Sequence, residues 1–489
     1  MEKEVLVLQE VVFAEDKNET EKLHYDLTGK AKLLEGFLQL EKEAIFSSLT
    51  YMNAFDAWAW NKYTGHNKWQ LAVSIKGIAH IRLYQGIEKK LLSQTYVDAH
   101  NEETITIEFS HIEPFNDDED SLVFFEIEAL ENTTVYAAKY QVEADSNNTN
   151  SVHLSVLICT YKRNRQVCKS LKKIEKSKFF QKGSTYYKAL SLRIIDNGSE
   201  LPLIDREGVK LYHNPNTGGS GGFTRGIVET RIDEEKFGIT HVVFMDDDAE
   251  FEIESFYRLY ALLRLIKPCY KKDVIAGRMF DLNNRCVQYT ASEVWNKGDI
   301  IHIGFRQDLR KIENLSHMNK KLGQYSGWWF ACYPMSFVRK ETPLPFFIHC
   351  DDVEYGLRHG GLPIILNGIQ VWHDTFEGRL SPLISYYDTR NAMIVNTLYN
   401  QYKGPGELLK RWWLRMVYDY KSNKKSALYP SIVAIRDYAK GQEYFMNNIE
   451  KKEGLKVSPY GWITLIIGTI QLPFFYIRVK AAFKSYKKG

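Results

Sequence analysis

The chain has 489 residues, more than a single hydrophobic core accommodates, and its length predicts two or three domains. Hydrophobic residues make up 44% of the sequence and charged residues 26%, which excludes a disordered or collagen-like protein. The 64 basic and 61 acidic residues leave a net charge of +3, so no strong positive field indicates nucleic acid as a partner.

The cysteines and the N-terminus indicate a reducing compartment. The six cysteines form no C-x-x-C pair, so they predict neither a zinc ribbon nor a redox motif. A cytosolic protein fits this pattern better than a secreted one. The N-terminal sequence MEKEVLVLQEVVF carries acidic residues without a long apolar stretch, and we therefore expect no signal peptide.

Residues 1–150 are predicted to form a β-sandwich or jelly-roll domain. TITIEF from Thr104 and LVFFEIEAL from Leu122 have the composition of strands, and Asn116-Asp117-Asp118 marks a turn between them. Five aromatic residues either fill the core of this domain or form a sugar-stacking face, and the core is the favoured interpretation. They are Trp58, Trp60, Tyr63, Trp69 and Tyr84. The polar segment 143–150 is predicted to be a linker.

Residues 151–395 are predicted to form an α/β domain with a mixed, mostly parallel sheet. Short apolar strands at 153–160, 190–197, 209–214 and 240–247 alternate with helical lengths. Ligands in such sheets gather beyond the carboxyl ends of the strands, so we expect these four ends to converge on one site.

Residues 396–489 are predicted to be helical and basic. Within them, Gly461 to Ile477 runs for 17 residues without a charge, although it contains Pro473, and a basic tail follows. The two interpretations are an interfacial segment attracted to anionic lipid and an ordinary buried helix.

Three carboxylates follow the apolar strand VVFM, as Asp246, Asp247 and Asp248. Carboxylates this crowded repel one another unless a cation lies among them. Mg²⁺ or Mn²⁺ is the natural partner, and either ion would also bind a diphosphate. The alternative is a solvated acidic turn that caps the next helix.

The glycine-rich stretch 214–226 is either a functional loop or a flexible connector. It lacks the Gly-Lys-Ser/Thr of a Walker A loop, and Thr224 stands where a G-x-G-x-x-G motif requires glycine. Both differences argue against a kinase or a dehydrogenase.

A second carboxylate pair, Asp351 and Asp352, also follows an apolar run. One of them is a candidate for the base that takes a proton from an attacking hydroxyl, with the other held by a donor such as Arg358. The alternative is a helix N-cap, with Glu354 in the first turn. Farther on, His373 is either structural or a third metal ligand beside the first acidic cluster.

Seven motifs in order resemble family 2 glycosyltransferases with the A-type nucleotide-sugar-binding fold, most of all galactofuranosyltransferases. They are TYKRNRQ, IDNGS, NPNTGGSGGFTRG, FMDDDAE, SGWWFACYP, PFFIHCDDVEYGLR and VWHDTFEGR, and they cover residues 150 to 395. The β-rich front and helical back match the three-part layout of that group.

The resemblance implies a role for each matching residue. Asp246, Asp248 and His373 would bind Mn²⁺ or Mg²⁺, and Asp352 would be the general base of an inverting transfer, with Asp351 shaping the acceptor site. Trp328 would pack on the acceptor sugar. The nucleotide-sugar pocket would be lined by Thr160, Arg163, Asp196, Asn216, Asp247 and Trp329.

The resemblance also implies the partners: a UDP-sugar donor, most of all UDP-galactofuranose, and a glycan or polyprenyl-diphosphate-linked acceptor for a cell-surface polysaccharide. We expect a cytoplasmic protein, peripheral on the inner face of the cell membrane, that can form a homo-oligomer. A rhamnosyl or other hexosyl donor stays open. So do two other classes: a non-catalytic carbohydrate-binding protein and a nucleotidyltransferase or phosphoryl-transfer enzyme.

Overall fold

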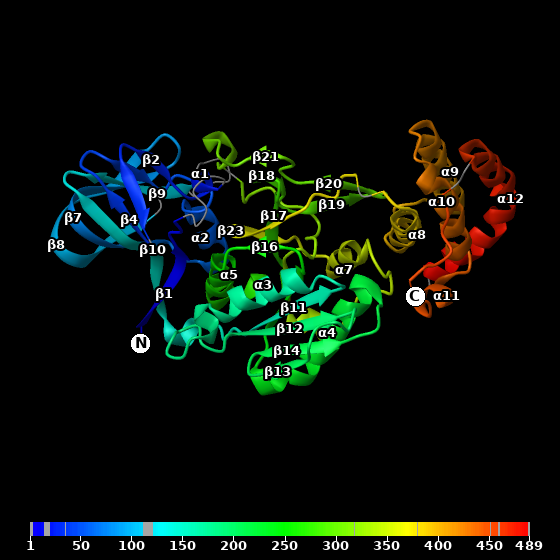
Figure 1. Cartoon of the computed structure of the whole chain (residues 1–489), viewed down its shortest axis with the longest axis horizontal. Coiled ribbons are helices and arrows are strands. Elements are labelled where there is room, and N and C mark those ends of the chain that lie inside the picture. Colours follow the sequence, from blue (N-terminus) through cyan, green and yellow to red (C-terminus); the bar gives the residue numbers. More distant parts are fainter. Residues whose placement is uncertain are drawn as a thin grey trace.

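The computed structural model describes residues 3–13, 20–34, 36–110, 121–316, 318–378, 380–449, 451–457 and 460–487. Three regions follow one another along the longest axis (Figure 1): a β-rich region, a central sheet with helices, and a group of helices. The turn predicted at Asn116-Asp117-Asp118 lies outside the described residues.

The β-rich region has ten described strands, all paired antiparallel in a single sheet rather than in two separate ones. The strands are β1 (Lys3–Glu10), β2 (Asp26–Thr28), β3 (Ala31–Leu34), β4 (Phe37–Leu40), β5 (Ile45–Ser47), β6 (Phe55–Asp56), β7 (Lys68–Gln85), β8 (Lys90–Ser110), β9 (Leu122–Ala129) and β10 (Thr133–Asp145). Two short helices, α1 (Glu21–His24) and α2 (Ala57–Thr64), connect them. Strand β10 runs into the predicted linker as far as Asp145.

Strand β7 joins the two halves of this sheet. Its first half pairs with β10 and its second half with β9, and the register shifts near Gly77, whose φ is +125°. A side chain at Gly77 would collide with Thr133, so only glycine fits this bend. Trp58, Trp60, Tyr63 and Trp69 are buried here, which confirms that these aromatic residues fill the core.

The central sheet contains the four predicted strands and several that the sequence did not indicate. Its strands are β11 (Leu154–Thr160), β12 (Leu190–Asp196), β13 (Ile204–Arg206), β14 (Val209–His213), β15 (His241–Asp246), β16 (Glu250–Phe251), β17 (Ile275–Asp281), β18 (Asn284–Thr290), β21 (Gln307–Asp308), β22 (Ala331–Pro334) and β23 (Ile364–His373). A separate hairpin is formed by β19 (Glu293–Asn296) and β20 (Asp299–His302). The helices of this region are α3 (Asn164–Glu175), α4 (Gly218–Phe237), α5 (Glu254–Leu265), α6 (Met335–Val338) and α7 (Asp351–His359).

The sheet is mixed, and only part of it is parallel. Strands β14, β12, β11 and β15 run parallel in that order, as predicted from their continuous apolar runs. Beyond β15 the neighbours β22, β17 and β18 are antiparallel, and β23 pairs parallel to β17. A mostly parallel sheet is therefore correct for the first half and wrong for the second.

Both faces of the parallel half are buried. Successive residues of β11 point to opposite faces: Val156 and Ile158 pack with α3 and α5, whereas Leu157 packs with α4. With helices on both faces, polar side chains are left for the strand ends, where the candidate site lies.

The β-rich region is joined to the sheet by buried polar contacts. The Tyr51 hydroxyl donates to Oε1 of Gln370 at 3.1 Å, and Nδ2 of Asn367 donates to the carbonyls of Tyr51 and Ala54. His24 pairs with Glu252 at 2.7 Å. Strand β23, which carries Asn367 and Gln370, is buried along its whole length.

The C-terminal helices are α8 (Pro382–Leu398), α9 (Pro405–Lys421), α10 (Lys425–Tyr438), α11 (Gln442–Met446) and α12 (Gly461–Tyr486). The boundary predicted at residue 395 falls inside α8, and the division into three domains stays a prediction. Helix α12 continues through Pro473 and packs through small residues, with Gly461 against Leu428 and Gly468 against Met416. Among the described residues, it is the one helix long and apolar enough to cross a membrane.

Candidate active site

An acidic turn follows β15 at the edge of the sheet. The interior residues Val242 to Met245 are fully buried, Asp246 ends the strand, and Asp247 and Asp248 form the turn. Because β15 lies between β11 and β22, the turn is in the middle of the sheet edge. Carboxylates are tolerated in this turn because the buried apolar part of β15 ends at Met245.

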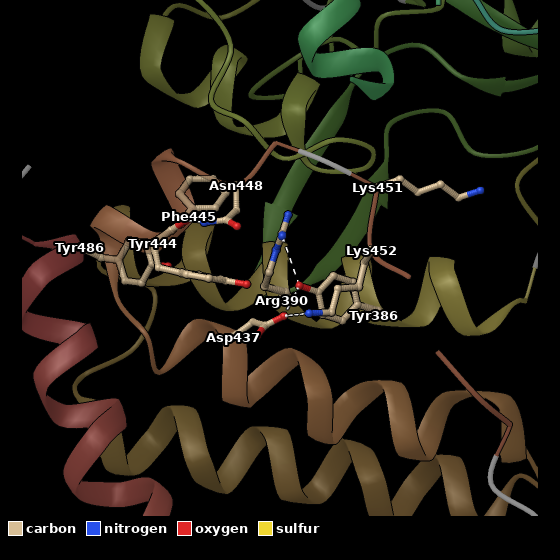
Figure 2. Close-up of a pocket in the computed structure, with 9 residues that line it drawn as sticks. All are labelled: Tyr386, Arg390, Asp437, Tyr444, Phe445, Asn448, Lys451, Lys452 and Tyr486. Atoms are coloured by element: carbon tan, nitrogen blue, oxygen red, sulfur yellow. Dashed lines mark hydrogen bonds and ion pairs between the residues drawn. The ribbon is translucent and has the colours of Figure 1, made fainter. Parts of the chain in front are cut away.

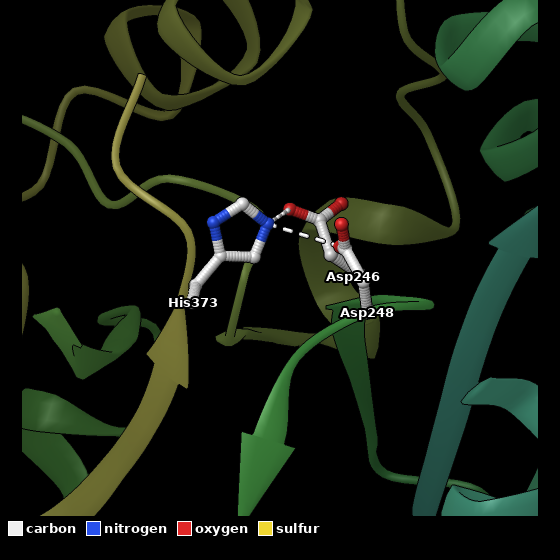
Figure 3. A group of neighbouring side chains, drawn as sticks. All are labelled: Asp246, Asp248 and His373. Atoms are coloured by element: carbon white, nitrogen blue, oxygen red, sulfur yellow. Dashed lines mark ion pairs between the residues drawn. The ribbon is translucent and has the colours of Figure 1, made fainter. Parts of the chain in front are cut away.

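His373, the last residue of β23, faces two of these carboxylates (Figure 3). Its Nε2 lies 3.0 Å from Oδ1 of Asp248 and 3.5 Å from Oδ2 of Asp246. One ligand atom from each of the three residues lies within 4.8 Å of the others. The structure thus brings together the three residues predicted to bind a metal ion.

The imidazole of His373 is held in one orientation. It is 3% exposed, its Nδ1 lies 2.7 Å from the carbonyl of Asp374, and its ring stacks on Phe376 at 5.4 Å. A carbonyl can only accept, so Nδ1 carries a proton and Nε2 faces the carboxylates. This is the usual orientation of a metal-binding histidine, and two carboxylates with an imidazole suit Mn²⁺ or Mg²⁺.

The electrostatics of this trio favour an additional positive charge. Burial raises the pKa of Asp246 to about 6, and the charges of Asp248 and Asp247 add to the effect against that of His373. Burial also acts on Asp248, but the hydrogen bond and charge of His373, with the charge of Arg163, outweigh it and lower its pKa. A proton on Nε2 of His373 links the imidazole to Asp248, and a bound cation would replace it.

Asp247 points away from the trio, toward the end of β11. Its carboxylate accepts from the Thr160 hydroxyl at 2.7 Å and from Arg163 at 2.8 Å, and Arg163 also lies 2.7 Å from Asp248. Arg163 is partly exposed. These contacts link Thr160, Arg163 and Asp247, which are three of the residues predicted to bind the nucleotide-sugar. They also place the guanidinium of Arg163 beside the acidic turn.

Two other residues predicted to line the pocket hold backbone turns. Asp196 is fully buried at the end of β12, and its carboxylate accepts from the backbone N–H groups of Gly198, Glu200 and Leu201. Asn216 accepts from the N–H of Gly218 at 3.2 Å, immediately before α4. Both residues shape the loops at the strand ends.

The glycine-rich stretch is the start of a helix and not a connector. Helix α4 begins at Gly218, whose φ is +70° and whose missing side chain leaves room for the carbonyl of Phe347. A side chain at Gly222 would collide with the sulfur of Cys159 in β11. The glycines therefore let the helix approach both the sheet and the segment before α7.

Asp351 and Asp352 lie in the first turn of α7, but neither caps it. The cap position is taken by Cys350, with φ +63°, so the N-cap interpretation is wrong in its detail. Carboxylates in the first turn are still favoured by the positive end of the helix dipole. Asp351 is buried and Asp352 is partly exposed.

The donor that holds Asp351 is not the one predicted. Ser220 of α4 donates to Oδ2 of Asp351 at 3.0 Å, whereas Arg358 pairs with Glu341 and Glu354. Arg358 lies about two turns farther along α7, and its ion pairs are made there rather than with Asp351 or Asp352. No sequence motif indicated Ser220, because its partner Asp351 is 131 residues away in the chain.

The environment of Asp352 makes its carboxylate more basic. Burial raises its pKa well above the usual range, and the charges of Asp351, Glu293 and Asp246 raise it further. Asp246 therefore lies within electrostatic reach of Asp352, which connects the second carboxylate pair with the trio.

The segment before α7 has an unusual backbone. Phe347, His349 and Cys350 all have φ between +63° and +75°, in the left-handed region. Nδ2 of Asn391 in α8 donates to the carbonyls of Ile348 and His349, both at 2.8 Å. A buried side chain from another helix thus stabilises the strained approach to Asp351, and no sequence motif indicated it.

The two tryptophans of the SGWWFACYP motif are both buried. Trp328 stacks on Phe244 at 4.8 Å and contacts Phe223, so its ring is part of the core and has no exposed face for a sugar. Trp329 donates to the carbonyl of Gly277 at 2.9 Å and lies beside Phe376.

The comparisons with known proteins agree with the motifs. Residues 13–143 match the model of the galactofuranosyltransferase 2 N-terminal family. The chain is 24% identical over 391 residues to galactofuranosyltransferase GlfT2 of Mycobacterium tuberculosis, and 23% identical over 397 residues to GlfT2 of Mycolicibacterium smegmatis. Each match covers 74% of this chain, but only 60% and 59% of the two relatives.

Among solved structures, a mannosyltransferase from Pyrobaculum calidifontis, in complex with GDP-Man and Mn²⁺, matches 69% of this chain and 86% of its own. The identity is 12% and the TM-score is 0.32. The family model and the two GlfT2 proteins confirm the resemblance that the ordered motifs indicated: over the matched residues the chain is similar to galactofuranosyltransferases.

Proposed function

We propose that this chain is an inverting, metal-dependent glycosyltransferase of family 2 with the A-type fold, which transfers galactofuranose from UDP-galactofuranose to a glycan acceptor. The observation that supports it most is the meeting of Asp246, Asp248 and His373 within electrostatic reach of Asp352. These residues lie on elements far apart in the sequence. If residues 246–248 were only a solvated acidic turn, nothing would require His373 to lie beside them.

Asp246, Asp248 and His373 hold Mn²⁺ or Mg²⁺ in this proposal. The ion, when bound, binds the diphosphate of the donor and neutralises the charge of the leaving nucleotide. Arg163 adds a positive charge beside it, and Asp247 keeps Arg163 and Thr160 in place. Asp196, Asn216 and Trp329 complete the donor pocket by shaping its loops and wall.

Asp352 is the general base in this proposal. It takes the proton from the acceptor hydroxyl as the oxygen attacks the anomeric carbon, and a single direct attack inverts that carbon. Its raised pKa suits this role, because a more basic carboxylate holds the abstracted proton more firmly. Asp351, held by Ser220, fixes the first turn of α7 and shapes the acceptor side.

We assign the acceptor to a glycan or polyprenyl-diphosphate-linked glycan of a cell-wall or capsular polysaccharide, approached from the cytoplasmic face of the membrane. Helix α12 supports a peripheral membrane contact, because Ile470 is 65% and Phe474 73% exposed although both are apolar. Trp462 and Ile466 extend this exposed row at helical spacing. Basic residues such as Arg478 and Lys480 follow it and suit anionic lipid.

The proposal is tested by calorimetry of UDP with the whole chain. We expect UDP to bind in the presence of Mn²⁺ and to bind much more weakly in EDTA or in Asp248→Asn, since the cation then no longer bridges protein and diphosphate. Glu341→Gln, which lies away from the trio, serves as a control for a lost carboxylate. Equal binding with and without EDTA would contradict a metal-dependent site.

The donor sugar is tested by product analysis with several UDP-sugars and a lipid-linked acceptor. Release of UDP with transfer of galactofuranose supports the proposal, and preferred transfer of rhamnose or another hexose would replace that sugar. Release of pyrophosphate or phosphate would indicate nucleotidyl or phosphoryl transfer instead.

A further inference from the structure

A cavity of about 160 Å³ lies among the C-terminal helices, away from the acidic trio (Figure 2). It is lined by residues of α8, α10, α11 and the last turn of α12 together with Asn448, Lys451 and Lys452, and we call it the cationic cavity. A small polar group fits such a space.

The side chains that line the cationic cavity carry more positive than negative charge. Arg390, Lys451 and Lys452 line it together with one carboxylate, that of Asp437. Arg390 and Lys452 lie beside Asp437, whereas the side chain of Lys451 points away from it (Figure 2). Asp437 is already shared: Lys452 lies 2.6 Å and Lys440 2.7 Å from its oxygens, and the Tyr386 hydroxyl donates to it at 2.8 Å. The lining therefore has a surplus of two positive charges.

Arg390 has no ion pair among the described residues, although it is only 7% exposed. Its guanidinium donates to three neutral acceptors: Oδ1 of Asn391 at 2.9 Å, the Tyr386 hydroxyl at 3.3 Å and the carbonyl of Phe346 at 2.8 Å. These use three of its five N–H groups. The guanidinium also lies over the rings of Tyr386, Tyr387 and Phe445, at 5.3, 4.9 and 5.5 Å from their centres. These contacts stabilise a cation, but buried arginines are normally also paired with an anion.

We propose that the cationic cavity binds a phosphate-bearing ligand. The surplus of two charges matches a phosphate group, which carries about −1.5 to −2 near neutral pH. A planar guanidinium with N–H groups to spare and flexible lysine ammonium groups is a common set of phosphate donors. The ring of Tyr444 lines the cavity with Lys451 and Lys452 and gives it an apolar wall.

The cationic cavity is linked to the candidate active site through Arg390. The same guanidinium that faces the cavity donates to Phe346, and the next residue, Asn391, holds the carbonyls of Ile348 and His349 before α7. A ligand that fixes Arg390 would also stabilise this segment. The binding site itself does not depend on the proposed transfer reaction.

The site is tested by calorimetric titration of the whole chain with inorganic phosphate and inorganic diphosphate, in EDTA. We expect saturable binding that Arg390→Met abolishes and that the double change Lys451→Met with Lys452→Met weakens at least tenfold. Lys484→Met, an exposed lysine on α12 outside the cavity, should leave binding unchanged. Since Arg390 also holds the backbone, the lysine pair tests the site even where Arg390→Met does not fold.

The source of the phosphate is distinguished with vesicles of phosphatidylcholine that contain phosphatidic acid, compared with phosphatidylcholine alone. If the lysine pair lowers both inorganic phosphate and phosphatidic acid binding, the ligand is a lipid headgroup; if it lowers only the former, the ligand is a free phosphate. Absence of saturation at millimolar phosphate, or binding equal in the lysine variant and the parent, would overturn the proposal. Asp248→Asn should keep phosphate binding while losing metal-dependent UDP binding, which separates this site from the proposed function.

Discussion

Asp352 has a carboxylate whose proton affinity is raised by burial and by three neighbouring acids. Burial raises the pKa of Asp351 beside it as well, but the carboxylate of Asp351 accepts a hydrogen bond from Ser220. In the proposed reaction the two neighbours differ in role because they differ in partners. At the scale of residues, this difference is the main support for assigning proton transfer to Asp352.

Asp352→Asn is expected to abolish transfer and to keep donor binding. The amide has the shape of the carboxylate but cannot accept the proton, and loss of a general base lowers turnover by roughly 10² to 10⁴-fold. Turnover with the UDP-sugar and calorimetry of UDP with Mn²⁺ measure the two effects. Turnover within a few-fold of the parent would remove Asp352 from this role.

Residues at strand ends were predictable, but their partners were not. Asp246, Asp248 and His373 each follow an apolar run that had to be a buried strand, so the sequence indicated their place at the sheet edge. Ser220 and Asn391 act on residues far away in the chain, and their short polar side chains have no distinctive spacing. Trp328 and Trp329 are adjacent in one motif, so the sequence does not distinguish their environments. Only the packing of Trp328 on Phe244 places its ring in the core.

At the scale of elements, helix α8 supports the start of α7 from behind. It presents Asn391 to the backbone carbonyls of a segment in which Phe347, His349 and Cys350 are all left-handed. Left-handed residues other than glycine persist only where surrounding contacts hold them. The orientation of Asp351 and Asp352 thus depends on a helix to which the proposed reaction assigns no reacting group.

Asn391→Leu is expected to lower turnover while metal-dependent UDP binding is kept. The control is Asn396→Leu on the same helix, a buried residue that binds Tyr402 and Trp295 and does not contact the segment before α7. Each change leaves buried polar groups unpaired and costs about 1–3 kcal/mol of stability. Equal turnover of the two variants, with stability measured by denaturant unfolding, would show that Asn391 has only a structural role.

The elements that the sequence indicated are those with continuous patterns. Strands β11, β12, β14 and β15 are predicted within about one residue of their bounds, because their apolar runs end at polar residues. Strands β13, β16, β21 and the β19–β20 hairpin are short and partly exposed, so their residues show no clear period. The prediction of a mostly parallel sheet missed the antiparallel pairing of β22, β17 and β18.

At the scale of the whole molecule, the β-rich region and the helices lie at opposite ends, with the sheet between them (Figure 1). The exposed apolar row of α12 is therefore at the far end of the molecule from the β-rich region. The sequence indicated this division through three regions of different composition and pattern. It did not indicate the contacts between the regions, because single polar side chains make them.

Ile470→Lys combined with Phe474→Lys is expected to weaken binding to vesicles that contain anionic lipid by at least tenfold. Both side chains are largely exposed, so the fold should be kept while apolar area for the bilayer surface is lost. The control is Ile232→Lys, an apolar side chain equally exposed on α4. Co-sedimentation measures the binding, and an equal loss in both variants, or in neither, would contradict a specific role of α12.

Strand β23 ends at His373 and carries, a few residues earlier, the side chains that bind the β-rich region. Separating the two regions would break the hydrogen bonds of the Asn367 and Gln370 side chains and expose one side of β23 to water. The strand that ends at His373 would then be less well held. The β-rich region therefore supports the strand that carries His373, and a fragment that starts at the central sheet lacks this support.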